Sequence, residues 1–241
     1  MKDVLPYPAA ATDKKQQVSE MFNRIAVTYD FLNHFLSAGI DRSWRKRAVK
    51  ILSELKPKII LDVACGTADF AIEIAKLNPE KITGIDLSEN MLAIGRNKIQ
   101  KKNLTDKIEL IAGDCESLPF TDNKFDAVTV GFGVRNFMNP LKGLKEINRV
   151  MKPAGKLAVL EFSKPENILV SKLFNFYFRI FCPFIGGLIS KDRNAYKYLQ
   201  FSVEKFPDGK KFLALMETAG FIETFQKKLT FGIASIYCGT K

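Results

Sequence analysis

Gly66 and Asp86 have the residue types and the spacing needed to hold a nucleoside. Gly66 stands in a turn after the apolar run 59–64, where the lack of a side chain lets the backbone approach a ligand closely. Asp86 follows about twenty positions later at the end of a second apolar run, where one carboxylate can bind both hydroxyls of a ribose. A strand, a turn, a helix and a second strand in this order indicate a nucleoside-binding βαβ unit.

The residues of the turn distinguish between nucleoside cofactors. A dinucleotide needs glycines at three places to hold its pyrophosphate, and the turn 64–69 has only Gly66. Asp69, in the first helical turn, would repel a pyrophosphate but attract the sulfonium and amino groups of S-adenosylmethionine. The turn therefore favours S-adenosylmethionine over NAD, and the remaining alternative is an ordinary α/β turn with a carboxylate at a strand end.

The elements that position these residues alternate between strands and helices. Strands are predicted at 59–64, 81–86, 108–112, 125–130 and 156–162. A helix at 208–219 then leads to strands 221–228 and 231–238, whose short connection predicts an antiparallel pair. This order predicts an α/β fold of the class I S-adenosylmethionine-dependent methyltransferases, Rossmann-like, with a seven-stranded sheet whose last strand is antiparallel.

Two further regions flank this sheet. The polar residues 1–20 predict a mobile N-terminal arm that orders only on contact, and residues 21–241 a single methyltransferase domain that begins with helices over 21–56. The chain between about 166 and 206 predicts a cap insertion. Its aromatic stretch 168–190 suits a core helix, the lining of an apolar pocket or a contact with lipid. Its proline and paired glycines argue against a simple membrane-spanning helix, and no stretch offers ~20 apolar residues without charge or breaker.

Composition narrows the class of protein. A chain of 241 residues suits one large domain, and its four cysteines have neither paired nor metal-ligand spacing, so we expect no disulfide framework and no metal site. No signal peptide is recognisable, which predicts a cytoplasmic protein, peripheral at most at the inner face of the membrane. The net charge of +11 predicts an anionic partner, either nucleic acid or an acidic membrane. The oligomeric state stays open, a homodimer included.

Several motifs together identify a family. They lie at 61–67, 113–120, 132–136 and 149–165, and an early block combines Tyr29, Asp30, Asn33, Leu36 and Ser37 with Trp44. From about Met21 to its end, the chain resembles the menaquinone/ubiquinone biosynthesis C-methyltransferases, the UbiE/MenG family. The resemblance implies methyl transfer from S-adenosylmethionine to a ring carbon of a polyprenylated quinol, demethylmenaquinol first and a ubiquinone precursor as the alternative.

The resemblance also assigns cofactor contacts, namely Thr67, Asp86, Asp114 and Cys115, beside Gly66. Asp114 directly follows the third strand, where it can accept a hydrogen bond from the adenine amino group.

Some residues depart from the family pattern. Ala68 and Ala154 stand where glycine is usual, Gly131 where a serine often contacts the cofactor, and Asp41 where a histidine is common. Gly131 removes one expected side-chain contact, and Asp41 argues against a histidine-based role at its position. The single histidine, His34, matches no motif and is interpreted as structural.

Catalysis is predicted at the end of the fourth strand. A quinol carbon becomes nucleophilic when the neighbouring hydroxyl loses its proton, and Arg135 is placed to stabilise the resulting oxyanion. Tyr29 is the second predicted catalytic residue. Tyr29, Asp41 and Glu161 are all candidates for the general base.

The basic charge motivates a nucleic-acid methyltransferase as the rival function. Amine-methylating enzymes need an Asn/Asp-Pro-Pro-aromatic loop after the fourth strand, where this chain has glycines around Phe132, and Cys182 and Cys238 lie away from the place of a cytosine-carbon nucleophile. Nucleic acid is therefore not expected as a partner. A non-catalytic binder of S-adenosylmethionine is the third interpretation. For the membrane, Lys172 and Arg179 are expected to contact anionic headgroups, with the lipid tail against residues 174–184.

Overall fold

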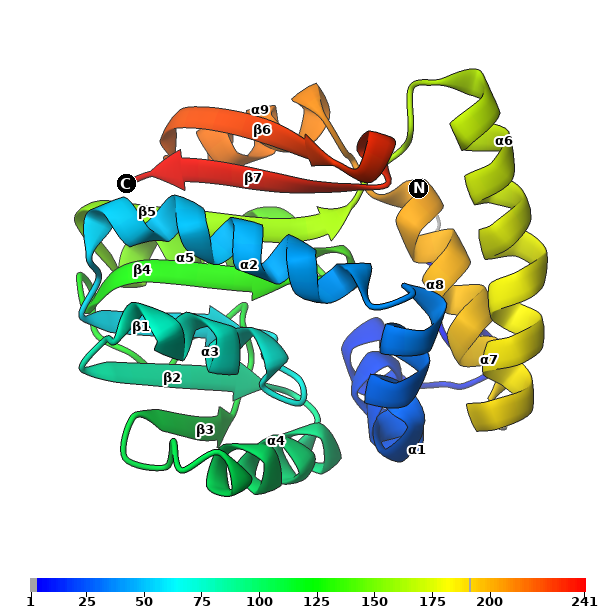
Figure 1. The fold of residues 1–241 in the computed structure, drawn as a ribbon, viewed down its shortest axis with the longest axis horizontal. Coiled ribbons are helices and arrows are strands. Elements are labelled where there is room, and N and C mark those ends of the chain that lie inside the picture. The colour runs from blue at the N-terminus through cyan, green and yellow to red at the C-terminus, as the bar shows by residue number, and fades with distance from the viewer. Residues whose placement is uncertain (1–3, 191) are drawn as a thin grey trace.

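A seven-stranded sheet lies at the centre of the molecule, as the computed structural model in Figure 1 shows for residues 4–190 and 192–241. The strand order is β3-β2-β1-β4-β5-β7-β6, and β7 runs antiparallel to both of its neighbours. This confirms the predicted class I methyltransferase sheet. The strands are β1 (Ile59–Val63), β2 (Lys81–Asp86), β3 (Ile108–Ala112), β4 (Phe125–Gly131), β5 (Met151–Phe162), β6 (Ile222–Leu229) and β7 (Ala234–Thr240).

Helices cover both faces of the sheet because successive strand residues point to opposite sides. Ile60 of β1 packs in a cluster with α2, α3 and α4, whereas its neighbour Leu61 packs in a second cluster with α5 and α9. The capping residues Ser88 and Asn139 accept backbone hydrogen bonds at the starts of α4 and α5, as their types predict. These helices are α2 (Ile40–Leu52), α3 (Asp69–Ile74), α4 (Glu89–Lys101), α5 (Pro140–Val150) and α9 (Lys210–Thr218).

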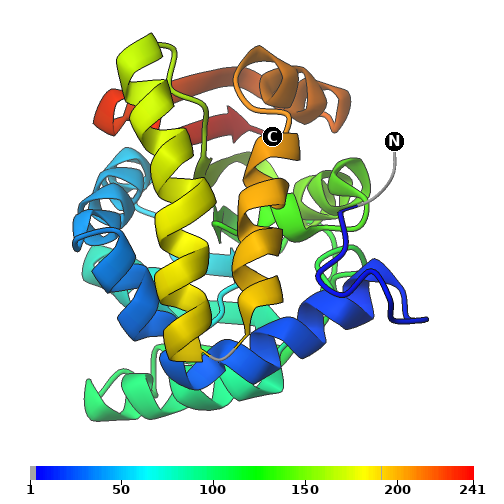
Figure 2. The ribbon, with the colours of Figure 1, turned by 90° about the vertical axis from the view of Figure 1, so that its right-hand side faces the viewer.

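A layer of helices stands at the carboxyl ends of the parallel strands. Figure 2 looks onto this edge and shows the yellow stretch α6–α7 beside the orange α8, with the blue α1 crossing below them. Phe174 and Phe178 turn inward against Val203 and line a cavity. Phe176 and Phe184 are exposed, so the aromatic stretch does not form a core helix. We call α6, η4, α7 and α8 the cap helices. The layer consists of α1 (Lys14–Leu36), α6 (Ile168–Phe176), η4 (Tyr177–Phe181), α7 (Cys182–Ser190) and α8 (Arg193–Lys205).

The stretch Ile168–Gly187 is long and apolar enough to cross a membrane by length and composition alone. The stretch contains Lys172, Arg179 and Pro183, so it agrees with the expectation that no run of ~20 apolar residues is free of charge and breaker. Pro183 does not end the helix, because the π-helical turn η4 precedes it and α7 continues to Ser190. A proline lacks the N–H of a regular helical hydrogen bond, and a wider π turn is a common way to accommodate such an interruption.

Two elements begin earlier than their patterns indicated. Helix α1 begins at Lys14 instead of Met21, with its N-terminus capped by Asp13; its first turns are polar, so the apolar periodicity is absent there. Strand β5 begins at Met151 instead of Lys156, because Met151 pairs with Phe125 of β4 and residues 152–155 form a bulge before the pairing resumes at Lys156. Residues 1–3 of the expected arm lie outside the described residues. The short helices are η1 (Ser53–Leu55), η2 (Ala75–Leu77), η3 (Val134–Asn136) and η5 (Thr230–Gly232).

Candidate active site

One cavity collects most of the predicted cofactor residues. Gly66, Asp86, Asp114 and Cys115 all line a cavity of ≈ 80 Å³ at the carboxyl ends of β1, β2 and β3. We call it the cofactor cavity. Its position agrees with the rule that open α/β sheets hold ligands outside the carboxyl ends of their strands.

Asp86 is held in a fixed orientation at the floor of this cavity. Its Oδ2 accepts a hydrogen bond from Gly66 N at 2.8 Å, and its Oδ1 accepts one from Ser88 N at 2.9 Å. Burial raises the pKa of Asp86, and these two N–H groups act against that rise. Each carboxylate oxygen keeps a further lone pair for a ribose hydroxyl.

Gly66 leaves room for a ligand against the backbone. Its φ is +54°, and a Cβ at this position would meet no atom within 4 Å. Glycine is therefore needed for the left-handed turn, and the space beside it is open to the cavity. The open backbone at Gly66 and the carboxylate of Asp86 fit the adenosyl part of S-adenosylmethionine.

Asp114 has a partner that the sequence did not indicate. Lys15 Nζ, from the first turn of α1, lies 2.6 Å from Asp114 Oδ2, and Glu116 N donates to Asp114 Oδ1 at 2.9 Å. Burial tends to raise the pKa of Asp114, but these partners outweigh it and hold the pKa below its usual value. Lys15 also lines the cofactor cavity, so α1 closes the cavity at Asp114. A lysine in a polar segment carries no sequence signal for such a contact.

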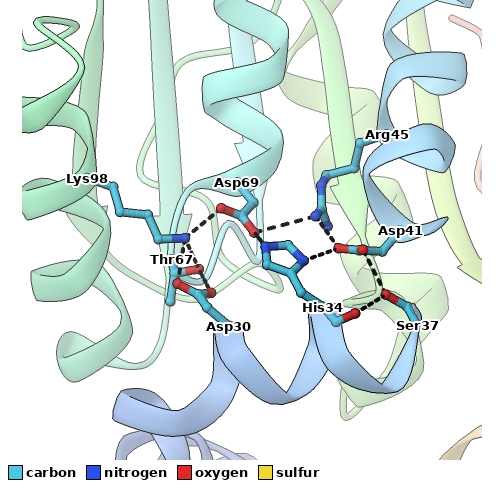
Figure 3. Close-up of polar contacts among 8 residues, drawn as sticks. All are labelled: Asp30, His34, Ser37, Asp41, Arg45, Thr67, Asp69 and Lys98. Carbon is cyan, nitrogen blue, oxygen red and sulfur yellow. Dashed lines mark hydrogen bonds and ion pairs between the residues drawn. The ribbon is translucent and has the colours of Figure 1, made fainter. Parts of the chain in front are cut away.

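Thr67 lies beside the cofactor cavity, in a network of charged groups (Figure 3). Its Oγ1 donates to Asp30 Oδ1 at 2.5 Å and accepts from Lys98 Nζ at 2.9 Å. Lys98 also pairs with Asp30 at 2.7 Å and with Asp69 at 2.5 Å. The Thr67 side chain lines a smaller adjoining cavity of ≈ 60 Å³ that it shares with Asp69 and Gly66.

His34, interpreted from the sequence as structural, belongs to the same network of charged groups. Its Nδ1 lies 2.8 Å from Asp41 Oδ2, and its Nε2 lies 3.6 Å from Asp69 Oδ2 (Figure 3). Arg45 pairs with both carboxylates, and Ser37 Oγ donates to Asp41 at 2.7 Å. Burial raises the pKa of Asp41, but Arg45, Ser37 and His34 bring it below its usual value. The single histidine of the chain thus contacts Asp41.

The side chain of Arg135 is buried in η3, the short helix that follows β4, and is held by a residue of the sheet. Its Nη1 lies 2.6 Å from Glu161 Oε1 and also donates to the carbonyl oxygen of Phe132. Arg135 and Glu161 expose 6% and 0% of their side chains, and burial raises the pKa of Glu161. Glu161, one of the candidates for the general base, thus fixes the orientation of the Arg135 guanidinium.

Arg135 faces a second and larger cavity of ≈ 320 Å³. We call it the apolar cavity, because most of its walls are apolar side chains from α1, α2 and the cap helices. It shares a wall with the cofactor cavity, formed by Phe22, Tyr29, Phe132 and Asn136. The polar side chains that reach it include Tyr29, Asn33, Asp41, Arg135, Asn136 and Tyr198.

The three candidates for the general base occupy different places. Tyr29 lines both cavities, and burial raises its pKa, so its hydroxyl stays protonated at neutral pH. Asp41 lines only the apolar cavity, and Glu161 lines neither. Within residues 4–190 and 192–241, no group of three or more His, Cys, Asp or Glu side chains is arranged to hold a metal ion.

The local structure shows what a glycine or a serine would change at three positions that depart from the family pattern. Ala68 and Ala154 have φ values of +66° and +62°, in the left-handed region where glycine is preferred. At Gly131, a Cβ would lie 2.8 Å from Cδ1 of Phe70, so a serine would require that ring to move.

Cys65, Cys115 and Cys238 are free thiols, and the side chain of Cys182 lies outside the described residues.

The sheet order is that of the class I S-adenosylmethionine-dependent methyltransferase fold. The sequence profile of the ubiE/COQ5 methyltransferase family matches residues 10–241, and the chain belongs to this family. The demethylmenaquinone methyltransferase of Bacteroides fragilis is 45% identical over 229 residues, covering 95% of this chain and 94% of the relative. The ubiquinone/menaquinone biosynthesis C-methyltransferase UbiE of Geobacter sulfurreducens is 45% identical over 232 residues, covering 95% and 90%.

Solved structures show the same fold at low sequence identity. A methyltransferase from Thermotoga maritima superposes with a TM-score of 0.61 at 22% identity, covering 92% of this chain and 99% of that protein. A second one, from Aquifex aeolicus, gives a TM-score of 0.54 at 21% identity, covering 80% and 88%. The family and the fold together imply the use of S-adenosylmethionine.

Proposed function

We propose that this protein transfers a methyl group from S-adenosylmethionine to a ring carbon of a polyprenylated quinol, and that the quinol is demethylmenaquinol. The observation that carries the proposal is the apolar cavity, which contains a buried arginine and adjoins the cofactor cavity. A relative from Bacteroides fragilis bears the name demethylmenaquinone methyltransferase, which supports this substrate. The name of the Geobacter relative includes ubiquinone biosynthesis, so a ubiquinone precursor is the alternative.

The chain offers contacts for the adenosyl part of the cofactor. Asp86 would bind the ribose hydroxyls, Asp114 the adenine amino group, and Gly66 would let the backbone approach. The Cys115 thiol lines the same cavity, and burial raises its pKa, so it offers a neutral contact. When bound, S-adenosylmethionine supplies a methyl group on a positively charged sulfur.

Arg135 would act on the quinol oxygen. A guanidinium held rigidly by Glu161, in a site with little water, stabilises an oxyanion without having to reorganise. The oxyanion makes the neighbouring ring carbon nucleophilic. This carbon would take the methyl group as the bond from methyl to sulfur breaks, which leaves S-adenosylhomocysteine, and would then release its own hydrogen as a proton, which restores the aromatic ring. The protein otherwise holds the two partners close and aligned.

Tyr29 would contribute from the shared wall of the two cavities. Because burial keeps its hydroxyl protonated, it acts as a hydrogen-bond donor rather than as the base. A donor at this wall lies where the ring carbon and the methyl group must meet, and it would fix the orientation of the quinol.

The test is a methyl-transfer assay with a demethylmenaquinol of short prenyl chain. Arg135→Ala should lower kcat by roughly 10²–10³-fold, the loss seen when an oxyanion donor is removed, and leave the affinity for S-adenosylhomocysteine unchanged. Arg42→Ala, on an exposed residue of α2, serves as the control and should behave like the wild type. Normal turnover by Arg135→Ala would make Arg135 structural, and transfer only to nucleic acid by the wild type would replace the proposal.

We infer that the protein works at the cytoplasmic face of an anionic membrane, through an exposed apolar face of α6–α7. Leu169, Leu173, Phe176, Ile180 and Phe184 recur at intervals of three and four residues, and they expose between 57% and 77% of their surface. This spacing places them on one side of a helix. Lys172 adds exposed positive charge there, whereas Arg179 is paired with Glu204 at 3.1 Å.

Sedimentation with anionic vesicles tests this inference. Each basic residue near such a surface contributes about 1 kcal/mol to binding. Salt screens this attraction, so binding should weaken as the salt concentration increases. Ile180→Glu should release the protein from the vesicles. Ile222→Glu, on β6, changes an isoleucine of nearly equal exposure, 59% against 57%, and should not. If the wild type remains in the supernatant at low salt, the exposed face has another role.

A further inference from the structure

The side chain of Tyr198 brings a hydroxyl group into the apolar cavity. Tyr198 lies on the cap helix α8, is 3% exposed and lines the cavity wall. Within the described part of the chain, its hydroxyl has no hydrogen-bond partner. Buried hydroxyls are nearly always bonded, because leaving one unpaired costs stability. An unpaired hydroxyl at a ligand cavity therefore indicates a partner that comes with the ligand.

Arg135 shows the same property at the same cavity. Its Nη1 is occupied by Glu161 and Phe132, whereas its Nε is buried without a partner among the described residues. The two residues lie close enough for the arginine charge to influence the tyrosine: burial raises the pKa of Tyr198, and Arg135 acts against this rise. The Tyr198 hydroxyl therefore stays protonated and is a donor, like Arg135 Nε.

We propose that Tyr198 is a substrate-binding residue that donates a hydrogen bond, together with Arg135 Nε, to the quinol oxygen beside the methylated carbon. The inference deepens the proposed function and rests on it. An ionised oxygen accepts two donors more strongly than a neutral hydroxyl does, so the pair favours the quinolate over the quinol. The cap and the sheet edge would then each supply one donor to the same oxygen.

Tyr198→Phe removes the hydroxyl and keeps the ring. In the full-length protein, kcat for the quinol should fall by about 10²-fold, as expected for the loss of one donor, and the affinity for S-adenosylhomocysteine should not change. The melting temperature without ligand should stay equal or rise, because the lost hydroxyl had no partner. A hydroxyl with a structural role would give the opposite change in melting temperature.

Tyr237→Phe is the matched control. Tyr237 is a buried tyrosine of β7 outside both cavities, and its hydroxyl accepts a hydrogen bond from Gly209 N at 2.9 Å. This variant should melt at a lower temperature and keep its activity. Wild-type kcat in Tyr198→Phe, or a loss of melting temperature and cofactor affinity together, would overturn the inference. An inactive wild type would instead overturn the proposed function.

Discussion

His34 and Asp41 share a hydrogen bond of 2.8 Å between Nδ1 and Oδ2. By the resemblance, position 41 is expected to carry a histidine. In this chain position 41 carries the carboxylate instead, and the imidazole that contacts it comes from position 34. His34 lies in the last turn of α1 and Asp41 in the first turn of α2. Asp69 contacts His34 and Arg45, so the network continues from this pair to the smaller adjoining cavity (Figure 3). The pair thus joins the first two helices to the cofactor side of the site.

Exchanging the two residues tests whether the pair itself is what the fold needs. His34→Ala and Asp41→Ala should each destabilise the protein by about 0.5–1.5 kcal/mol, because each removes the hydrogen bond between the two side chains, while Asp41 keeps Arg45 and Ser37 as partners in the first variant. The double variant His34→Asp with Asp41→His should recover much of this loss in urea unfolding. If the exchange variant loses as much free energy of unfolding as His34→Ala and Asp41→Ala lose together, the two residues cannot exchange places.

Asp86 should account for a large part of the cofactor affinity. Asp86→Ala removes the acceptor for the ribose hydroxyls, and hydrogen bonds to a charged group contribute about 1.5–3 kcal/mol. Calorimetric titration with S-adenosylhomocysteine should show a loss of this size. Asp106→Ala, on an exposed loop aspartate, is the control. Unchanged affinity of Asp86→Ala would remove this residue from the site.

Asp62 should make stability depend on pH. It is fully buried in β1; Oδ1 accepts from Thr129 at 2.6 Å, and Oδ2 has no partner in the described residues. Burial raises the pKa of Asp62 to about 7 from an ordinary value of 3.8. The protonated form thus favours the folded state, and its contribution is complete below pH 3.8 and is lost as pH rises toward 7.

Unfolding at several pH values checks the expectation for Asp62. The wild type should lose up to about 1.4 kcal/mol per pH unit across this window relative to Asp62→Asn, which cannot titrate. Parallel pH profiles of the two proteins would contradict a raised pKa.

Ala154→Gly should stabilise the protein. A non-glycine residue in the left-handed region costs about 1–2 kcal/mol, and the added flexibility of glycine in the unfolded chain returns part of this. The net gain of about 0.5–1 kcal/mol corresponds to a rise in melting temperature of roughly 1–4 °C for a chain of this length. Ala214→Gly, in the exposed interior of α9, should change stability in the opposite direction. A lower melting temperature for Ala154→Gly would refute the explanation.

The positions of the parallel strands along the chain were accessible from the sequence, because buried parallel strands are largely apolar runs. Strands β2 and β3 begin and end at their predicted residues. Gly66, Asp86 and Asp114 could be found for the same reason: each follows a strand, and strand ends converge at one edge of a parallel sheet.

Residues that reach the site from α1 and α8 were not accessible in this way. Lys15, Asp30 and His34 depend on how α1 lies across the sheet edge, which no local pattern encodes. Tyr198 sits at an ordinary helical spacing, so its type and position resemble those of a core residue. Only the tertiary packing shows that its hydroxyl opens into a cavity.

Helix α1 contributes side chains to both cavities: Lys15 and Ser19 to the cofactor cavity, Ile25 and Asn33 to the apolar cavity, and Tyr29 to both. Any ligand that shifts this helix on one side changes the free energy of binding on the other side. Such a linkage is reciprocal. If S-adenosylhomocysteine strengthens the binding of the quinol by some factor, the quinol must strengthen the binding of S-adenosylhomocysteine by the same factor.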